Sequence, residues 1–379
     1  MVSDNLIAAI NSQSRVAGLT HDFYRYPARF SPILAREIIT QFSKPGDLVI
    51  DPFVGGGTTL VECASLGRKS IGIDLSSLAT FIGRVKTTPL QEGDGEIIRR
   101  AVSRILSKDL LSSTGPKLDD HYGKNLGSQE TWRIRKFLAG ATGIAKRLHE
   151  KRCEEFVRMI LLRAGQWALD SKRELPSISA LRSKVEECAE LMLQAIDEFA
   201  FCLSLHDNDN CKPIILERSA VGLDEDPIFE LHKNPALILT SPPYPGLHML
   251  YHRWQIEGRR ETAFPFWLAG SLDGRGASYY NLGGRHEPQL LSYYNNLSAS
   301  LSSLRKLCTT STTLVQVVAF SEPEWQLEEY LRVVKKIGFE EFFPRTKRIV
   351  REVPSRKWYT SLQAPLASKF EYVLFHKLI

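Results

Sequence analysis

Short apolar runs, each followed by turn residues, mark the first part of the chain. Residues 47–53 (DLVIDPF) form such a run before a glycine-rich turn, and residues 69–74 (KSIGID) form another. Runs of this kind are typical of buried strands. The stretch 58–66 between them predicts a helix that ends at Gly67. A strand, a helix and a strand in close succession make a βαβ unit, so the sheet here is expected to be parallel.

The middle of the chain, from about Gly93 to Phe201, has a helical pattern instead. Apolar residues recur with the spacing of one helix face at 134–148 and at 185–199, and a third helix is expected at 156–169 between them. These segments predict a helical insert that is large enough to have a small core of its own.

Strand signals return after the insert and alternate with helical ones. The expected strands are 213–216, 236–240, 313–320, 339–343 and 370–376, and the expected helices are 289–307 and 324–337. Such alternation is typical of a doubly wound sheet. The last two strands have no helix between them, so they are expected to be antiparallel neighbours. The predicted fold class is α/β: a doubly wound, mostly parallel, Rossmann-like sheet with an antiparallel last strand, plus a helical insert.

Composition narrows the class of protein. Hydrophobic residues make up 43% and charged residues 24% of the 379 residues, which is typical of globular proteins. No apolar run approaches the roughly 18 residues that span a bilayer, and the N-terminus lacks the basic and apolar regions of a secretory signal. The six cysteines are scattered without a CxxC pair, so neither a zinc ribbon nor a disulfide framework is expected. We therefore expect a cytoplasmic protein that contacts no membrane and holds no metal.

The glycine-rich turn, D-P-F-V-G-G-G-T-T at Asp51–Thr59, is the first motif with chemical meaning. Such a turn lets the backbone approach a ligand at the switch point of a doubly wound sheet. A P-loop requires a lysine after its last glycine, but Thr58 follows Gly57, and a dinucleotide fingerprint requires glycine where Leu60 stands. The interpretation that remains is an S-adenosylmethionine loop, with Asp74 at the end of the second strand accepting from both ribose hydroxyls. A turn without a ligand is the alternative.

A second motif, T-S-P-P-Y at Thr240–Tyr244, directly follows an expected strand. Two consecutive prolines fix the backbone and cannot continue a central strand, so they leave rigid carbonyls at the edge of the sheet. An amino group on an aromatic ring can donate to such a carbonyl and to the Ser241 hydroxyl. Tyr244 would then offer a ring face on which a base can stack. Taken alone, the motif is also compatible with a plain turn.

Together and in this order, the two motifs resemble those of the S-adenosylmethionine-dependent DNA amino-methyltransferases, which methylate cytosine N4 or adenine N6. The resemblance extends upstream to H-D-F-Y-R-Y-P-A-R-F-S-P at His21–Pro32, which is similar to the segment that closes over the methionine end of the cofactor. It extends downstream to the strand Phe370–Lys377 and excludes the helical insert. It implies the methyltransferase version of the Rossmann-like fold.

The resemblance also implies site residues. Those implied for S-adenosyl-L-methionine are Tyr26, Pro27, Ala28, Phe30, Asp51, Pro52, Phe53, Gly55, Gly57, Thr58, Thr59, Asp74, Leu75 and Glu217, and those implied for catalysis are Ser241, Pro242, Pro243 and Tyr244. Glu217 is included because the family usually has an acid near the end of the third strand, where it would touch the adenine ring.

The first letter of the tetrapeptide bears on the target base. The cytosine-N4 members of the family typically have serine there and the adenine members aspartate, so Ser241 favours cytosine. Methylation of cytosine C5 is disfavoured, because it needs a cysteine after proline and the chain has no Pro-Cys pair. We expect a site-specific DNA cytosine-N4 methyltransferase that flips its base out of the duplex, in restriction–modification or phage defence. The alternatives are an adenine-N6 DNA or RNA amino-methyltransferase and a non-catalytic DNA-binding subunit.

Two segments have an arginine-rich composition that suits contact with DNA. The stretch after Tyr244 interleaves arginines with aromatic residues, among them Trp254, and the loop 345–357 is strongly basic. The arginines expected to contact DNA are Arg253, Arg259, Arg260, Arg275, Arg285, Arg348 and Arg351. A lid packed on its own aromatics and a solvated loop are the alternatives. The net charge of +6 permits double-stranded DNA as a partner but does not establish it.

The expected organisation has three parts. Residues 1–92 form the cofactor-binding first part of the methyltransferase domain, residues 93–211 form the helical insert, and residues 212–379 form the catalytic second part with DNA-contacting loops. The insert would serve target recognition or dimerisation, since the chemistry needs only the sheet and its loops. A cognate restriction endonuclease or another defence protein is a candidate partner, and the chain would act as a monomer or a dimer.

Overall fold

We describe the fold from a computed structural model of the chain. It describes residues 3–14, 16–26, 30–112, 116–206, 211–232, 234–244, 253–257, 260–274, 282–283, 287–320, 322–343, 347–352 and 370–379. No helix among these residues is long and apolar enough to cross a membrane.

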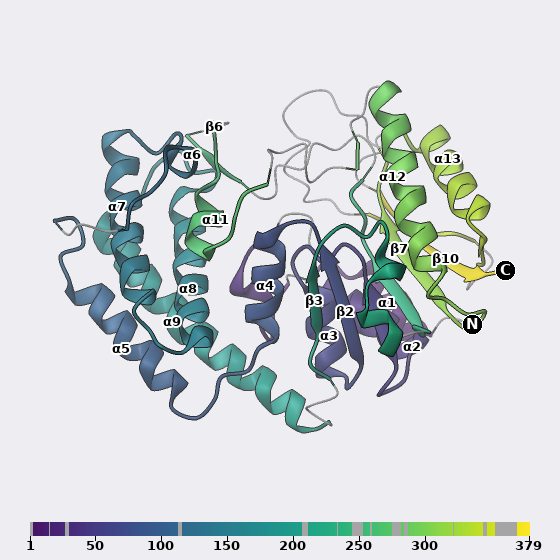
Figure 1. The fold of residues 1–379 in the computed structure, drawn as a ribbon, viewed down its shortest axis with the longest axis horizontal. Coiled ribbons are helices and arrows are strands. Elements are labelled where there is room, and N and C mark those ends of the chain that lie inside the picture. Colours follow the sequence, from purple (N-terminus) through teal and green to yellow (C-terminus); the bar gives the residue numbers. More distant parts are fainter. Residues whose placement is uncertain are drawn as a thin grey trace.

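An eight-stranded sheet forms the centre of the molecule, with the order β3-β2-β1-β4-β7-β10-β8 and with β9 paired to β10 (Figure 1). Its strands are β1 (Leu48–Asp51), β2 (Lys69–Asp74), β3 (Ile214–Glu217), β4 (Leu237–Thr240), β7 (Thr313–Val318), β8 (Phe339–Glu341), β9 (Ile349–Glu352) and β10 (Phe370–Leu378). The first five strands of this order are parallel, and β10 is antiparallel to β7, β8 and β9. The predicted fold class is thereby confirmed.

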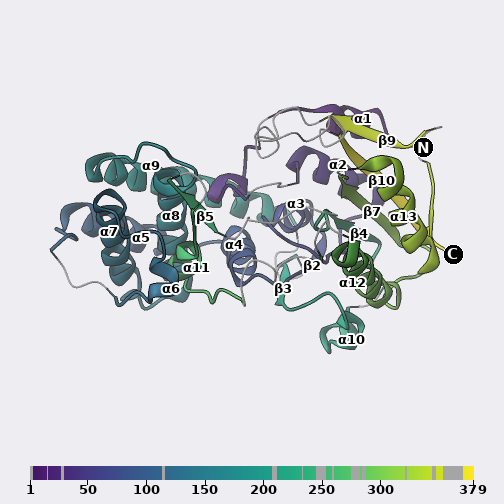
Figure 2. The ribbon, with the colours of Figure 1, turned by 90° about the horizontal axis from the view of Figure 1, so that it is seen from above.

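The central strands are buried on both faces, which is why they appear in the sequence as continuous apolar runs. Val49 and Leu237 pack under α1 (Asp4–Asn11) and α2 (Pro32–Phe42). Their neighbours along the strands face α12 (Glu287–Arg305) and α13 (Pro323–Lys336) on the other side. Figure 2 shows α1 and α2 on one side of the strands and α12 on the other.

The helical insert is present as expected and contains α5 (Asp94–Ser107), α6 (Asp120–Gly123), α7 (Gln129–Ala145), α8 (Lys151–Leu169) and α9 (Ile178–Ser204). The buried helix α8 contacts α5, α7 and α9. Between this insert and the sheet lies α4 (Ser77–Thr87), which packs on α8 as well as on β2 and β3 (Figure 1). The remaining short helices are α3 (Thr58–Ser65), α10 (Ile228–Leu231) and the 3-10 turns η1 (His21–Phe23) and η2 (Leu223–Glu225).

The chain returns to the insert after the second motif, which the sequence did not indicate. The hairpin of β5 (Trp254–Ile256) and β6 (Arg260–Thr262) is followed by α11 (Phe264–Ala269), and both β5 and α11 pack on α8. We call helices α5–α9 together with β5, β6 and α11 the helical unit. The division of the chain at 92 and 211 stays a prediction, but in space the helical unit includes residues from beyond 211.

Candidate active site

The carboxyl ends of four parallel strands bring the two predicted motifs together. β1 ends at Asp51 and lies between β2, which ends at Asp74, and β4, which ends at Thr240. The chain leaves β1 towards β2 and returns on the other side at β4, so this is the switch point of the sheet, where ligands of such folds bind. Asp74 is the register partner of Glu217 at the end of β3.

The glycine-rich turn requires glycine at two of its positions. Gly55 has a φ of 49° and Gly57 a φ of 75°, in the left-handed region that strains other residues. A Cβ on Gly57 would lie 3.2 Å from the Cα of Gly83 on α4, and a Cβ on Gly55 would lie 3.2 Å from the ring of Tyr26. The turn is thus packed closely between α4 and the upstream segment, and Gly57 also caps the start of α3.

Asp74 fixes this turn from the neighbouring strand. The amide of Gly55 donates to Oδ2 of Asp74 over 2.8 Å, and the amide of Ser76 donates to Oδ1 over 2.8 Å. Burial raises the pKa of this carboxyl to about 6, and the hydrogen bonds from Ser76 and Gly55 lower it in part. Asp74 is therefore ionised at neutral pH and has the charge needed to accept from hydroxyl donors.

Lys86 on α4 also contacts the glycine-rich turn, and this residue was not predicted from the sequence. Its ammonium donates to the carbonyl of Gly56 over 2.7 Å and to the carbonyl of His21 over 3.2 Å, and the residue is 1% exposed. A single lysine in an amphipathic helix gives no local signal of such a role. The imidazole of His21 lies 2.7 Å from Glu62 on α3, which Arg36 also contacts, so the upstream segment is anchored to α2 and α3.

The upstream segment packs against the glycine-rich turn and the start of α3. Tyr26 is buried against Gly55, and the carbonyl of Phe30 accepts from the Thr58 hydroxyl over 3.5 Å. Pro27 and Ala28 lie outside the described residues. Pro52 is buried, whereas Phe53 and Leu75 are partly exposed at the same edge.

A hydrogen bond joins the two motifs directly. The Thr240 hydroxyl donates to Oδ1 of Asp51 over 2.9 Å, although the residues are 189 positions apart. Asp51 also accepts from the amide of Phe53 and from the hydroxyl of Thr59. Burial raises the pKa of Asp51 to about 6, and these three hydrogen bonds lower it in part. Asp51 is thus a link between the glycine-rich turn and the tetrapeptide.

The tetrapeptide is held at several points. The Ser241 hydroxyl lies 3.0 Å from the carbonyl oxygen of Val317 on β7 and 3.2 Å from the hydroxyl of Tyr244. The hydroxyl of Tyr293 on α12 donates to the carbonyl of Pro243 over 2.9 Å. Pro242 is buried between them. These contacts fix the backbone at the edge of the sheet, as the two prolines predict.

Tyr244 is placed differently from the expectation of a ring open to a stacked base. Its side chain is 5% exposed and packs in the core beneath α12, and its hydroxyl donates to Oε1 of Glu371 on β10 over 3.0 Å. The hydrogen-bonding partner at the far end of the chain draws the ring inward, and the ring face is not open at the surface of this structure.

The arginines predicted to contact DNA fall into different surroundings. Arg253 forms ion pairs with Asp273 and Glu261 inside the helical unit, whereas Arg260 is exposed beside Glu257. Arg259, Arg275 and Arg285 lie outside the described residues.

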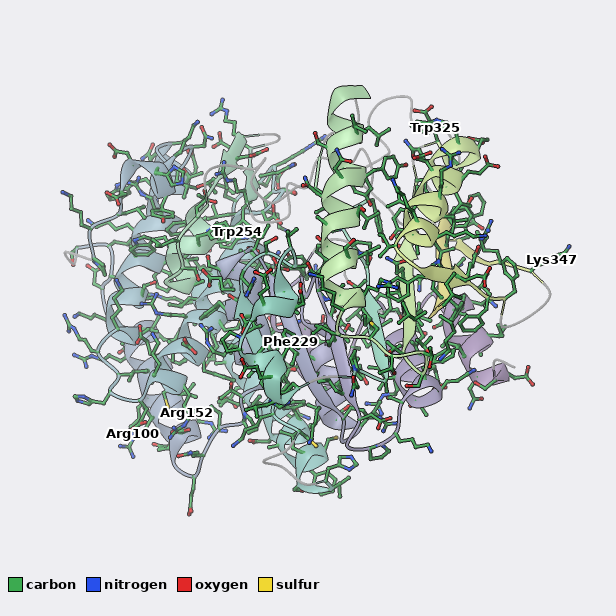
Figure 3. The ribbon with its side chains drawn as sticks, turned by 45° about the vertical axis from the view of Figure 1, so that its right-hand side comes forward. Arg100, Arg152, Phe229, Trp254, Trp325 and Lys347 are labelled. Carbon is green, nitrogen blue, oxygen red and sulfur yellow. The ribbon has the colours of Figure 1, made fainter. Side chains whose placement is uncertain are left out.

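The basic segment 345–357 is not a simple loop, because residues 349–352 form β9. Arg348 makes two hydrogen bonds to Glu341, and Arg351 pairs with Glu371, so both guanidinium groups bind carboxylates of the protein itself. Lys347 is exposed and points away from the sheet (Figure 3).

Three aromatic residues in the described part of the stretch after the tetrapeptide are internal. Trp254, Phe264 and Phe266 are fully buried in the helical unit, and the indole of Trp254 donates to the hydroxyl of Tyr24 over 2.9 Å. Figure 3 shows Trp254 among the elements of that unit. These three rings therefore form core of the helical unit, as in the alternative of a segment packed on its own aromatics, and are not available to contact DNA.

Comparison with known proteins relates this site to a protein family. Residues 7–79, which contain the upstream segment, the glycine turn and Asp74, match the N6/N4 methyltransferase family described as DNA methylase. The resemblance to the DNA amino-methyltransferases is confirmed. The family implies S-adenosylmethionine as the methyl donor, and the close-packed glycine turn beside an ionised carboxylate at a switch point fits that cofactor.

Curated relatives match over short segments. The type II methyltransferase M.MjaII of Methanocaldococcus jannaschii is 36% identical over 110 residues, which are 29% of this chain and 18% of that protein. M.MvaI of Kocuria varians is 36% identical over 111 residues, 26% of this chain and 24% of that protein. The DNA adenine methyltransferase YhdJ of Escherichia coli is 40% identical over 108 residues, 27% of this chain and 37% of that protein. In each case the match spans less than two-thirds of the relative.

Proposed function

We propose that the chain is a DNA methyltransferase that transfers a methyl group from S-adenosylmethionine to the exocyclic N4 amino group of cytosine. The hydrogen bond between Thr240 and Asp51 supports this most directly, because it places the tetrapeptide beside the cofactor turn at the switch point of the sheet. A cofactor site and an amine site that share one edge are what a direct transfer between two bound molecules requires.

The residues of the turn would hold the cofactor, which supplies an electrophilic methyl group when bound. Asp74 would accept from the two ribose hydroxyls while keeping its contact with Gly55, and the exposed Glu217 would contact the adenine ring. Tyr26 would cover the methionine end. The hydroxyl of Thr80 donates to Glu217 over 3.2 Å and holds that carboxylate towards α4.

The tetrapeptide would bind the amine. The target cytosine has to leave the duplex to reach this edge, so the base is flipped out. Its N–H groups then donate to the Ser241 hydroxyl oxygen and to the Pro242 carbonyl. This localises the nitrogen lone pair towards the methyl group, and no covalent intermediate with the protein is needed. Positioning supplies most of the rate.

The test is a methylation assay with isotope-labelled S-adenosylmethionine and either DNA or RNA, followed by identification of the product nucleosides. N4-methylcytosine in DNA is the expected product. N6-methyladenine would establish the second candidate, which the similarity to a protein named as a DNA adenine methyltransferase favours. Calorimetry with the cofactor tests the third candidate, because a DNA-binding subunit with a degenerate pocket would not bind the cofactor. The intact glycine-rich turn and Asp74 argue against this candidate.

We propose further that the protein acts in the cytoplasm on double-stranded DNA as part of restriction–modification. Two of the relatives are named as type II methyltransferases, which supports that setting. Mapping of modified bases in a host that expresses the chain would reveal the recognition sequence.

A further inference from the structure

A chain of polar contacts runs from the tetrapeptide to the C-terminal strands. Ser241 lies 3.2 Å from the hydroxyl of Tyr244, which donates to Oε1 of Glu371, and Nε of Arg351 lies 2.9 Å from Oε2 of the same carboxylate. Glu371 on β10 and Arg351 on β9 are direct register partners. Glu371 is 8% exposed.

The charges along this series of contacts determine which group donates in each hydrogen bond. Glu371 beside a guanidinium is held as a carboxylate, which can only accept, so Tyr244 is the donor in their hydrogen bond. The Tyr244 oxygen then presents lone pairs to Ser241. The single proton of Ser241 therefore has two acceptors, the Tyr244 oxygen and the Val317 carbonyl, both provided by the protein.

This matters for the proposed reaction, on which the inference rests. A hydroxyl that binds an amine N–H must accept, so its own proton must point elsewhere. If Tyr244 instead donated its proton to Ser241, it would occupy a lone pair of the Ser241 oxygen that the amine N–H needs. Because Tyr244 donates to the ionised Glu371, its proton is not directed at Ser241.

We propose that Glu371 and Arg351 are positioning residues of the methyl transfer, which act through Tyr244 to keep Ser241 an acceptor for the target amine. Arg351 thus has a function inside the protein rather than the DNA contact expected from its sequence. The Glu341–Arg348 pair on the same group of strands is the natural comparison, because it has a similar chemistry without a contact to the tetrapeptide.

The experiment compares steady-state methylation by the wild type, Tyr244→Phe, Glu371→Gln and the double variant. Tyr244→Phe removes only the hydroxyl and keeps the packed ring. Tyr294→Phe is its matched control, because Tyr294 is buried in the same core and its hydroxyl donates to the backbone of Gln326. Glu341→Gln is the control for losing an ion pair.

We expect kcat to fall about tenfold in each single variant, with KM for DNA and the cofactor dissociation constant within about twofold of wild type. The double variant should be no slower than the slower single variant, because both changes break one chain of contacts. The two controls should keep the wild-type kcat. Thermal unfolding of every variant checks that it is folded, and if Glu371→Gln unfolds, Arg351→Lys replaces it in the cycle.

A kcat for Tyr244→Phe equal to that of Tyr294→Phe would overturn the inference, as would effects of the two single changes that multiply in the double variant. Failure of the proposed function has a different signature: wild-type protein that binds the cofactor but methylates neither DNA nor RNA.

Discussion

Two carboxylates at the sheet edge and two in the helical unit have opposite surroundings. At the edge, Asp51 and Asp74 accept from hydroxyl and amide groups, and burial raises the pKa of each to about 6. In the helical unit, Asp94 lies beside Arg152; burial alone would raise its pKa, but the hydrogen bonds from Arg152 and from the amide of Gln91 together outweigh burial and lower it. Glu154 likewise pairs with Arg158.

The difference separates structural charges from charges available to a ligand. A carboxylate that is neutralised by an arginine of its own protein is held in place and offers little to a second partner. A carboxylate with a raised pKa and neutral donors stores unfavourable desolvation, which new hydrogen bonds from a ligand can relieve. By this criterion Asp51 and Asp74 are available to a ligand, whereas Asp94 and Glu154 serve the structure of the helical unit.

The largest expected effect tests whether β5 belongs to the helical unit. Trp254→Ala should lower the free energy of unfolding by about 3–5 kcal/mol, because the indole is 1% exposed and packs against Gly165. Trp325, which is 42% exposed, is the control, and Trp325→Ala should change stability by less than about 0.5 kcal/mol. Denaturant unfolding measures both. Equal effects of the two changes would mean that the hairpin is not part of that core.

The next largest effect compares alanine substitutions of one carboxylate from each region. Asp74→Ala should weaken cofactor binding by about 2–4 kcal/mol, since a charged acceptor for two hydroxyls is lost, while the protein stays folded. Asp94→Ala should do the reverse: it removes the buried carboxylate that Arg152 binds and lowers the melting temperature, but cofactor affinity stays within about twofold. Calorimetry and thermal unfolding measure the two quantities. Unchanged affinity in Asp74→Ala would contradict the ribose assignment.

The pH dependence of cofactor binding is a smaller effect with a defined sign. If ribose hydroxyls donate to the ionised Asp74, as proposed, affinity should be constant above about pH 6 and fall below it by up to about tenfold per pH unit. The contribution of Asp74 to stability has the opposite sign. Its folded-state pKa lies above the ordinary value of 3.8, so the folded protein holds the proton more tightly and this contribution grows as the pH falls from about 6 towards 3.8.

Calorimetry across about pH 5 to 7.5 tests this dependence, with Asp74→Asn as the control. The asparagine variant should bind weakly at every pH without a step near 6. A step that persists in this variant would assign the titration to another group, of which Asp51 is the first candidate.

The smallest expected effect concerns the surface of the helical unit. Arg133, Lys146 and Arg147 on and after α7 are exposed and positively charged. If each of these side chains neutralises one DNA phosphate, its change to glutamine should reduce the log–log slope of DNA binding against salt by about 0.9. Site choice in the methylation assay should change while cofactor affinity survives. Variants that methylate the same sites but no longer form a dimer in solution would make the unit an assembly element.

Local patterns predicted most strands of the central sheet, three helices of the insert and the two motifs. The strand Lys69–Asp74 has the bounds that its apolar run predicts, and the helices of the insert lie where the spacing of apolar residues places them. The glycine turn and the tetrapeptide could be identified because their residue types fix the backbone within a few positions. The helices α1, α2 and α4 were not predicted.

The sequence by itself determined the parallel core, the order of the motifs and the carboxylates at the strand ends, since each depends on residues close together in the chain. Only the tertiary structure decided which groups meet. The register of β9 with β10 gives Arg351 its partner Glu371, and the adjacency of β1 and β4 gives Asp51 its donor Thr240. Trp254 likewise is buried in a core formed by helices far upstream in the chain. The reason is physical: periodicity reports which face of an element is buried, whereas the partner on that face is set by strand order and packing between distant segments.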